Sequence, residues 1–280
     1  MIDKNGNKIV SNDTPPSPEF VLKETEFFLA TFKKNRNDRI ALTVAKKINC
    51  FLDVSEDWKT INDALAFLDE YVPVTKSETF LWELVYIRRK IVDIMMDDYE
   101  DPLVIAGQYR IQADYFSHVV RVNPSLYNRY VEVNSLCNAS AHFDKAMDND
   151  TADALLVKAY ELYEKIPPKE NKKHHETGER LYLNMLLCCK APNTDKELKA
   201  QLYRKMIKAS RFLYVNNGDI ESLKLVILGY LDCFSNRFIT YEEEKEDIDQ
   251  VVLWAQKELD EGADVLKEPL RKLRRAILWG

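Results

Sequence analysis

Glycine is scarce in this sequence, with seven residues among 280. Glycine-rich phosphate loops, β-bulges and Asn-Gly hairpins all depend on glycine's backbone freedom, so the scarcity argues against each of them. The chain also lacks the GxSxG, P-loop, GxGxxG and HExxH patterns, and no nucleophile–base signature is recognisable. We therefore expect a protein that is not an enzyme and needs no cofactor. An enzyme with an unrecognised helical active site is the remotest alternative.

Metal-binding patterns are also missing. The five cysteines form no CxxC pair and are too few for a disulfide scaffold, which is typical of a reduced intracellular protein. His174-His175 and Cys188-Cys189 contain ligand atoms, but zinc ligands normally come in pairs two to four residues apart. The acidic runs at 97–101 and 242–249 lack the spaced ligands and central glycine of an EF-hand. We expect no metal site.

Long apolar runs are absent, and so is an excess of positive charge. No segment approaches the roughly 20 apolar residues of a membrane span, and the first residues contain no apolar signal region. The net charge is −6 and the pI is about 5.5, which makes an extended nucleic-acid surface unfavourable. We expect a cytoplasmic protein with no nucleic-acid partner and no stable membrane association.

What the sequence has in abundance is helical periodicity. In the stretch 76–99 the apolar residues Phe80, Leu84, Ile87, Ile91 and Ile94 recur every three or four positions. Ser17-Pro18-Glu19 predicts a helix start, and capping boxes are predicted at Thr75…Glu78, Thr194…Glu197 and Thr240…Glu243. The predicted helices are 18–34, 38–53, 56–71, 76–99, 102–121, 125–147, 151–166, 175–190, 195–215, 219–235, 241–260 and 264–278. Short connections between them indicate antiparallel neighbours in a bundle or a solenoid.

The domain organisation follows from this pattern. Residues 1–17 are polar and proline-rich and predict a flexible tail, residues 18–235 a helical domain, and residues 236–280 a helical extension. Aromatic-bearing helices centred near 115, 160, 208 and 254 recur about every 45 residues. No side-chain motif repeats with them. A tetratricopeptide-like solenoid is therefore one interpretation of the fold.

Three short stretches resemble another family. YRIQADYF (109–116) looks like the fifth helix of 14-3-3 proteins, SETFLWELVY (77–86) resembles the start of their third helix, and AY (159–160) with LYLN (181–184) is similar to a later pair. The resemblance implies an all-α antiparallel bundle of the 14-3-3 type, with about nine family helices plus extra N- and C-terminal helices. Residues 125–149 would be an insertion. It also implies a homodimer of adaptors that hold phosphopeptides in a groove.

The phosphate-binding positions of the family are altered here. Its Lys and Arg on the third helix correspond to Ile87 and Ile94, and its Arg-Tyr pair on the fifth helix corresponds to Ser117 and His118. A phosphate needs clustered cations, and placing it against isoleucine leaves its charge uncompensated. The resemblance thus implies a groove whose dependence on phosphate is weakened or lost.

The remaining groove positions predict where a peptide binds. Arg110 replaces a groove Lys and shares one helical face with Asp114, Ser117, His118 and Arg121. By resemblance, Leu183, Asn184, Leu228 and Asp232 contact the peptide, although solvated surface or ordinary core explains these residues too.

By the same resemblance, a dimer interface would include Ile48, Phe51, Trp58 and Tyr86. Intramolecular core explains most of these residues equally well.

The C-terminus predicts a basic amphipathic helix. Leu266, Leu270, Leu273 and Ile277 form an apolar stripe beside five basic residues in 267–275. Two interpretations are open: the helix docks on the acidic helix 241–260, or the tail 263–280 binds the chain's own peptide groove and regulates it.

The predicted function is therefore a 14-3-3-like adaptor that binds peptide or phosphopeptide segments of client proteins. The main alternative is a phosphate-independent, tetratricopeptide-like helical scaffold.

Overall fold

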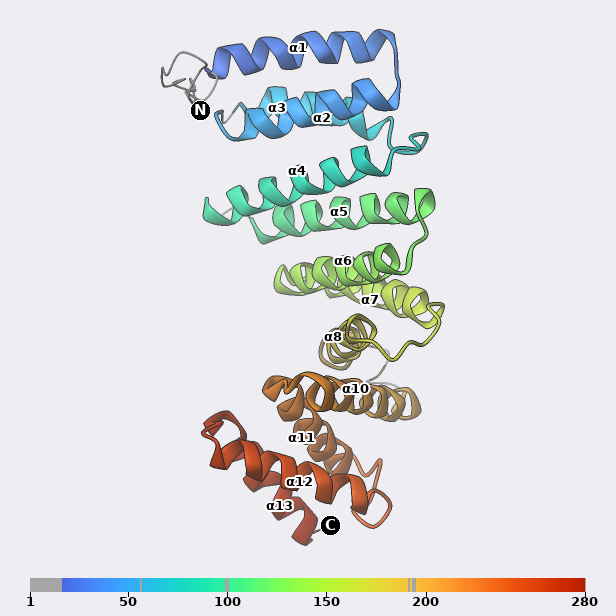
Figure 1. Ribbon diagram of the computed structural model, residues 1–280, viewed down its shortest axis with the longest axis vertical. Coiled ribbons are helices and arrows are strands. Elements are labelled where there is room, and N and C mark those ends of the chain that lie inside the picture. The colour runs from blue at the N-terminus through green and yellow to red at the C-terminus, as the bar shows by residue number, and fades with distance from the viewer. Residues whose placement is uncertain (1–16, 56, 99–100, 191, 193–194, 280) are drawn as a thin grey trace, which may run out of the picture. The chain divides into compact units, whose positions relative to one another are not determined.

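A computed structural model describes residues 17–55, 57–98, 101–190, 192 and 195–279. Throughout these residues the regular structure is helical, which confirms the all-α expectation (Figure 1). The helices are α1 (Pro18–Lys34), α2 (Asp38–Leu52), α3 (Trp58–Asp69), α4 (Glu78–Asp97), α5 (Pro102–Val122), α6 (Leu126–Lys145), α7 (Asn149–Glu164), α8 (Lys172–Cys188), α10 (Lys196–Asn217), α11 (Ile220–Ser235), α12 (Lys245–Asp260), the short 3₁₀ helix η1 (Asp264–Leu266) and α13 (Lys267–Trp279). The predicted tail lies outside the described residues, apart from Ser17.

The helix starts show which capping predictions were correct. Ser17 caps α1 as predicted, with its Oγ accepting a hydrogen bond of 3.3 Å from the amide of Phe20. At α4 the prediction of Thr75 was wrong: the amide of Phe80 donates to the Oγ of Ser77, 3.2 Å away. The hydroxyl of Thr75 instead donates to Asp38 Oδ1 at 2.5 Å and accepts from the amide of Ser77 at 3.1 Å, so it holds the connection that precedes α4.

Two further helices also begin later than predicted. Asp195 caps α10 by accepting from the amides of residues 197 and 198, each at 3.0 Å, and the predicted cap Thr194 is outside the described residues. Glu243 accepts from the amide of Thr240 at 2.7 Å, as in a capping box, but residues 241–244 form a turn and α12 starts only at Lys245. The predicted capping residues therefore gave the starts of α10 and α12 to within a few residues.

The contacts divide the chain into two compact units, residues 1–94 and 95–280. Unit 1 contains α1, α2, α3 and most of α4, and its fully buried side chains include Phe32, Phe51, Phe80 and Ile87. Its one buried charge, among the described residues, is Arg88, which donates to Asp69 Oδ2 at 2.9 Å. Unit 1 is therefore held by an apolar core with a single buried ion pair.

Unit 2 is a succession of packed helices, in which α8 lies at a large angle to α7 and α10 (Figure 1). Helix α6 packs against α5, α7 and α8, helix α10 packs against α8 and α11, and α13 packs against α11 and α12. Hydrogen bonds between consecutive helices join residues at varied separations, such as Tyr203 and Asp232, 29 apart. Those between non-consecutive helices of unit 2 join residues 41 to 45 positions apart. Examples are Asn134–Thr177, 43 apart, Tyr214–Glu258, 44 apart, and Lys205–Tyr160, 45 apart. This periodicity is the geometry of stacked helical hairpins, in which each hairpin contacts its neighbours.

Two segments that looked like additions are integral to unit 2. The predicted insertion 125–149 consists mainly of α6, which has Tyr130, Val133 and Leu136 in the core. The apolar stripe of the C-terminal helix is also buried, with Leu266 and Leu273 at 0% exposure in the same core. The stripe thus packs on α11 and α12, which is the docking interpretation of this helix.

Among the described residues, no helix is both long and apolar enough to cross a membrane.

Candidate ligand-binding site

The face predicted on α5 is only partly available to a ligand. Arg110 and Asp114 are exposed, whereas Ser117 and His118 are half-buried. The hydroxyl of Ser117 lies 3.5 Å from the carbonyl of Ala113, to which it donates. Burial lowers the pKa of His118, and the positive charge of Arg121 lowers it further, against the opposing effect of Asp114. The face therefore offers two exposed cations, Arg110 and Arg121, and an imidazole that is mostly neutral near pH 7.

The residues predicted on α8 and α11 are engaged within unit 2. Leu183 is half-buried against the core, and the amide of Asn184 is placed to hydrogen-bond the buried thiol of Cys137. On α11, Leu228 is exposed, and Asp232 accepts a hydrogen bond of 3.2 Å from the Tyr203 hydroxyl. Of these four residues, only Leu228 and Asp232 are exposed, Leu228 at 36%.

The seven predicted peptide-binding residues do not share one packed surface. They lie on α5, α8 and α11, and α6 packs between the first two of these helices, while α10 packs between the last two. In addition, only residues 98–101 separate α4 from α5, which were compared with the third and fifth family helices. Four residues leave no room for a fourth family helix between them.

The four predicted dimer-interface residues have contrasting exposure. Ile48 and Phe51 are 1% and 2% exposed in the core of unit 1, so they are not offered to another molecule. Trp58 is half-buried, and Tyr86 is 55% exposed. A homodimer through this region stays a prediction that depends on Tyr86 and Trp58.

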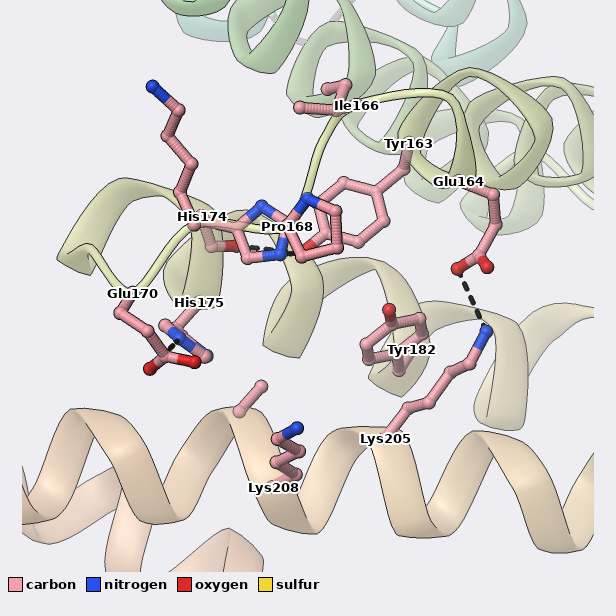
Figure 2. Close-up of a pocket in the computed structure, with 12 residues that line it drawn as sticks. Tyr163, Glu164, Ile166, Pro168, Glu170, His174, His175, Tyr182, Lys205 and Lys208 are labelled. Atoms are coloured by element: carbon pink, nitrogen blue, oxygen red, sulfur yellow. Dashed lines mark hydrogen bonds and ion pairs between the residues drawn. The ribbon is translucent and has the colours of Figure 1, made fainter.

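A different part of unit 2 contains a hollow of about 260 Å³ (Figure 2). It lies among the end of α7, the loop 165–171, the first turns of α8 and the middle of α10. Aromatic, acidic and basic side chains line it: Tyr163, Glu164, Ile166, Pro168, Lys169, Glu170, His174, His175, Tyr182, Lys205, Lys208 and Ala209. None of the seven predicted peptide-binding residues lines this hollow.

His174 is fixed on one side of the hollow by two phenols. The Tyr163 hydroxyl donates to the carbonyl of His174 at 3.0 Å, so its oxygen accepts from Nε2, also at 3.0 Å. The Nδ1 atom is then unprotonated and accepts from the Tyr130 hydroxyl, 3.2 Å away. Burial lowers the pKa of His174, and the neighbouring His175 lowers it further. His174 is thus a neutral structural side chain with both ring nitrogens occupied.

A close approach of two helices positions this network. A Cβ atom added to Gly178 on α8 would lie 2.6 Å from the hydroxyl oxygen of Tyr163 on α7. Real Cβ atoms are almost never this close to another atom, so glycine is required for the phenol to reach His174.

His175 presents the opposite situation. Its ring is stacked on Phe212 of α10, with centroids 3.8 Å apart and planes 15° apart, and the residue is 7% exposed. The buried Nε2 atom has no hydrogen-bond partner, since the closest carboxylate oxygen, Glu170 Oε2, is 3.6 Å away. Burial lowers the pKa of His175, while Glu170 opposes this effect.

Two lysines of α10 border the hollow in different states. Lys205 is engaged: its Nζ donates to Glu164 Oε1 and to the Tyr160 hydroxyl, both at 2.9 Å. Lys208 is exposed, and its amine extends from α10 toward the hollow (Figure 2). No ion pair to Lys208 occurs within the described part of the chain. The hollow is therefore bordered by one lysine that is ion-paired, Lys205, and by one that has no ion pair among the described residues, Lys208.

The sequence signal for this site was present but pointed to different chemistry. His174-His175 stood out as a histidine pair and was weighed only as a source of metal ligands. Within the described residues, no three His, Cys, Asp or Glu side chains are placed to hold a metal ion. The informative signal was the i, i+3 spacing of Lys205 and Lys208, because it puts both amines on one side of α10.

Comparisons with known proteins add no identification: no protein-family model matches the chain, and no curated protein matches it.

Proposed function

We propose that this protein is a non-catalytic scaffold that binds peptide segments of client proteins through unit 2, without requiring phosphate. The observation that carries the proposal is the stacking of successive helices, in which hydrogen bonds between non-consecutive helices of unit 2 join residues 41 to 45 apart. Stacked helical hairpins expose extended surfaces between successive helices, and such surfaces suit the binding of a peptide. The hollow on α7, α8 and α10 lies on a surface of this kind.

Independence from phosphate is supported by the positions where the resemblance would place the phosphate. Ile87 is fully buried in unit 1, and Ser117 bonds its own helix. The lowered pKa of His118 keeps that imidazole neutral near pH 7. These side chains therefore lack the clustered positive charge that a phosphate dianion needs.

Fluorescence polarisation with a peptide library tests the proposal. Each peptide is measured in phosphorylated and unphosphorylated form, together with a form that has Glu in place of the phosphoresidue. We expect binding in which phosphate changes the affinity by less than about twofold, well under 1 kcal/mol. A preference of tenfold or more for the phosphorylated peptides would contradict phosphate independence. A complete lack of peptide binding would overturn the scaffold function.

A further inference from the structure

The hollow beside His175 has a polar group that the folded chain leaves unsatisfied. A buried hydrogen-bonding atom without a partner is uncommon in folded proteins, because its lost hydration is not replaced. The Nε2 atom of His175 is such an atom, and it faces Glu170 across 3.6 Å (Figure 2). A carboxylate on that side favours the tautomer with the proton on Nε2. The Nε2–H group of His175 therefore points toward the Glu170 carboxylate, which at 3.6 Å is too far away to accept a hydrogen bond.

Glu170 is held only weakly in this position. It belongs to the loop between α7 and α8, and its side chain is 80% exposed. Its contact with His175 is longer than a hydrogen bond. An exposed contact of this kind stabilises little, so another anion can take its place at small cost.

The charges of the lining indicate which anion fits. Three lysines and two glutamates line the hollow, so it has one net positive charge when both histidines are neutral. Lys205 is already paired with Glu164, which leaves Lys208 as the cation of α10 that faces an incoming ligand. Of the described residues that line the hollow, none is an arginine, the side chain best suited to bidentate phosphate binding. A monoanion matches this lining better than a dianion does.

We infer that the hollow between α7, α8 and α10 is a receptor for a carboxylate of an acidic peptide, in which His175 Nε2 and Lys208 Nζ bind the carboxylate and Glu170 is an internal substitute that the ligand displaces. The walls of Tyr182 and Pro168 are placed to contact the apolar part of the acidic side chain. This inference rests on the proposed scaffold function and specifies what that scaffold recognises.

The experiment titrates the full-length protein, labelled with ¹⁵N, with sodium acetate while its NMR spectrum is recorded. Sodium chloride at equal ionic strength is the control, and inorganic phosphate is the competing probe. We expect saturable shifts of the His175 ring and of nearby amides with acetate, at a dissociation constant on the order of millimolar. Linear shifts that chloride reproduces would overturn the site. Phosphate binding more than tenfold tighter than acetate would overturn the carboxylate assignment.

Two variants with opposite expected effects make the test specific. Lys208→Met removes an exposed amine and weakens acetate binding at least tenfold. Glu170→Gln removes the internal competitor and tightens binding at least threefold. Glu261→Gln is the matched control for Glu170→Gln, since it changes the net charge equally at an exposed position in the turn after α12. If Glu170→Gln tightens binding no more than Glu261→Gln does, displacement of Glu170 is wrong.

Peptides then show whether the bound carboxylate belongs to a side chain or to a chain end. They also distinguish failure of the carboxylate receptor from failure of the scaffold function. Acetyl-Gly-Glu-Gly-amide presents a side-chain carboxylate, and acetyl-Gly-Gly-Gly with a free C-terminus presents a main-chain carboxylate. We expect the first to bind, and exclusive binding of the second would overturn the side-chain assignment. Library peptides that bind equally to wild type and Lys208→Met would refute the receptor while leaving the scaffold function intact.

Discussion

The two units treat buried polar groups differently. In unit 1 the three buried polar side chains that the structure describes are each bonded: Thr25 to the carbonyl of Val21, Thr75 to Asp38, and Arg88 to Asp69. The buried side-chain atoms without a partner, in the described residues, all belong to unit 2: Ser135 Oγ, His175 Nε2, Glu179 Oε2 and Ser210 Oγ. A buried polar atom without a partner reduces stability, because its lost hydration is not replaced. The two units therefore differ in how completely their buried polar side chains are satisfied by the folded chain.

The largest effect is expected from breaking the buried ion pair of unit 1. Asp69→Ala leaves the Arg88 guanidinium, with its side chain 6% exposed, without this carboxylate. Removing one partner of a buried pair costs about 3–5 kcal/mol, and partial exposure of Asp69 reduces the expected loss to about 3 kcal/mol. Hydrogen exchange of the amides of α3 and α4 measures this loss.

The exposed pair Arg36–Glu70, 2.8 Å apart, provides the control. Glu70→Ala is expected to cost less than about 0.5 kcal/mol, because exposed pairs contribute little. An equal loss in both variants would show that unit 1 does not depend on its buried pair.

The next effect concerns the close packing of α7 and α8 in unit 2. Gly178→Ala puts a methyl group 2.6 Å from the Tyr163 hydroxyl oxygen and displaces the phenol from His174. We expect a net loss of about 2 kcal/mol, because overpacking costs more than the alanine gains in helix propensity. Urea denaturation measures the loss.

Gly107 on α5 is the matched control, since a Cβ atom there meets nothing within 4 Å. Gly107→Ala is expected to stabilise the protein by about 0.5–1 kcal/mol. A stabilising Gly178→Ala would mean that the contact with Tyr163 relaxes freely.

A smaller and opposite effect is expected at Glu179. Burial raises the pKa of Glu179, and the nearby Asp219 and Glu176 raise it further, against the opposing effect of the Ser210 and Ser222 hydroxyls. The folded protein therefore disfavours the charged form of Glu179. Glu179→Gln keeps the shape without the charge and is expected to stabilise unit 2 by about 1 kcal/mol at pH 7. Thermal unfolding compares it with Glu261→Gln, at an ion-paired position with 61% side-chain exposure, where we expect no gain. Destabilisation by Glu179→Gln would show that the carboxylate has a partner that matters.

The smallest expected effect is a difference between the two units in how their free energy of unfolding depends on pH. All four histidines are in unit 2, and burial is the main cause that lowers the pKa of each. The unfolded chain therefore binds more protons than the folded one just below pH 6.5, so the free energy of unfolding of unit 2 falls as the pH falls through that region. The loss stops once the pH is below the folded pKa values.

Hydrogen exchange between pH 8 and pH 5.5 measures both units in one sample. Around His175 the relevant charges are Glu170 from the loop, Lys208 and Arg211 from α10, and His174 from its own helix. We expect unit 1, which has no histidine, to keep its stability over this range, and unit 2 to become less stable. Protonation of Glu179 acts in the opposite direction, so the effect is clearest in the Glu179→Gln variant.

The sequence predicted the helices well because their signals are local. Pro18 after Ser17 and the Asn216-Asn217-Gly218 break both mark observed helix ends, and Gly218 has a φ of 66° at the end of α10. The cap of α4 was misassigned because two hydroxyl side chains, Thr75 and Ser77, compete within three residues, and the tertiary contact of Thr75 with Asp38 favours Ser77 as the cap.

The candidate site was not predictable in the same way. His175, Phe212 and Glu170 come from three segments, and only their packing leaves Nε2 without a partner. The sequence shows which side chains can donate or accept, but not which of them remain unsatisfied after folding. The groove residues carried over by resemblance lie on helices that the hairpin stacking separates.

The upper limit on the sequence separation of these interhelical bonds also bears on how the protein is made. No hydrogen bond described above in unit 2 joins residues more than 45 positions apart, the separation of Lys205 and Tyr160. A helix leaving the ribosome therefore finds its bonding partner already outside, on the hairpin synthesised just before it. Each hairpin can serve as the template for the next, and no part of the described network has to wait for a distant segment.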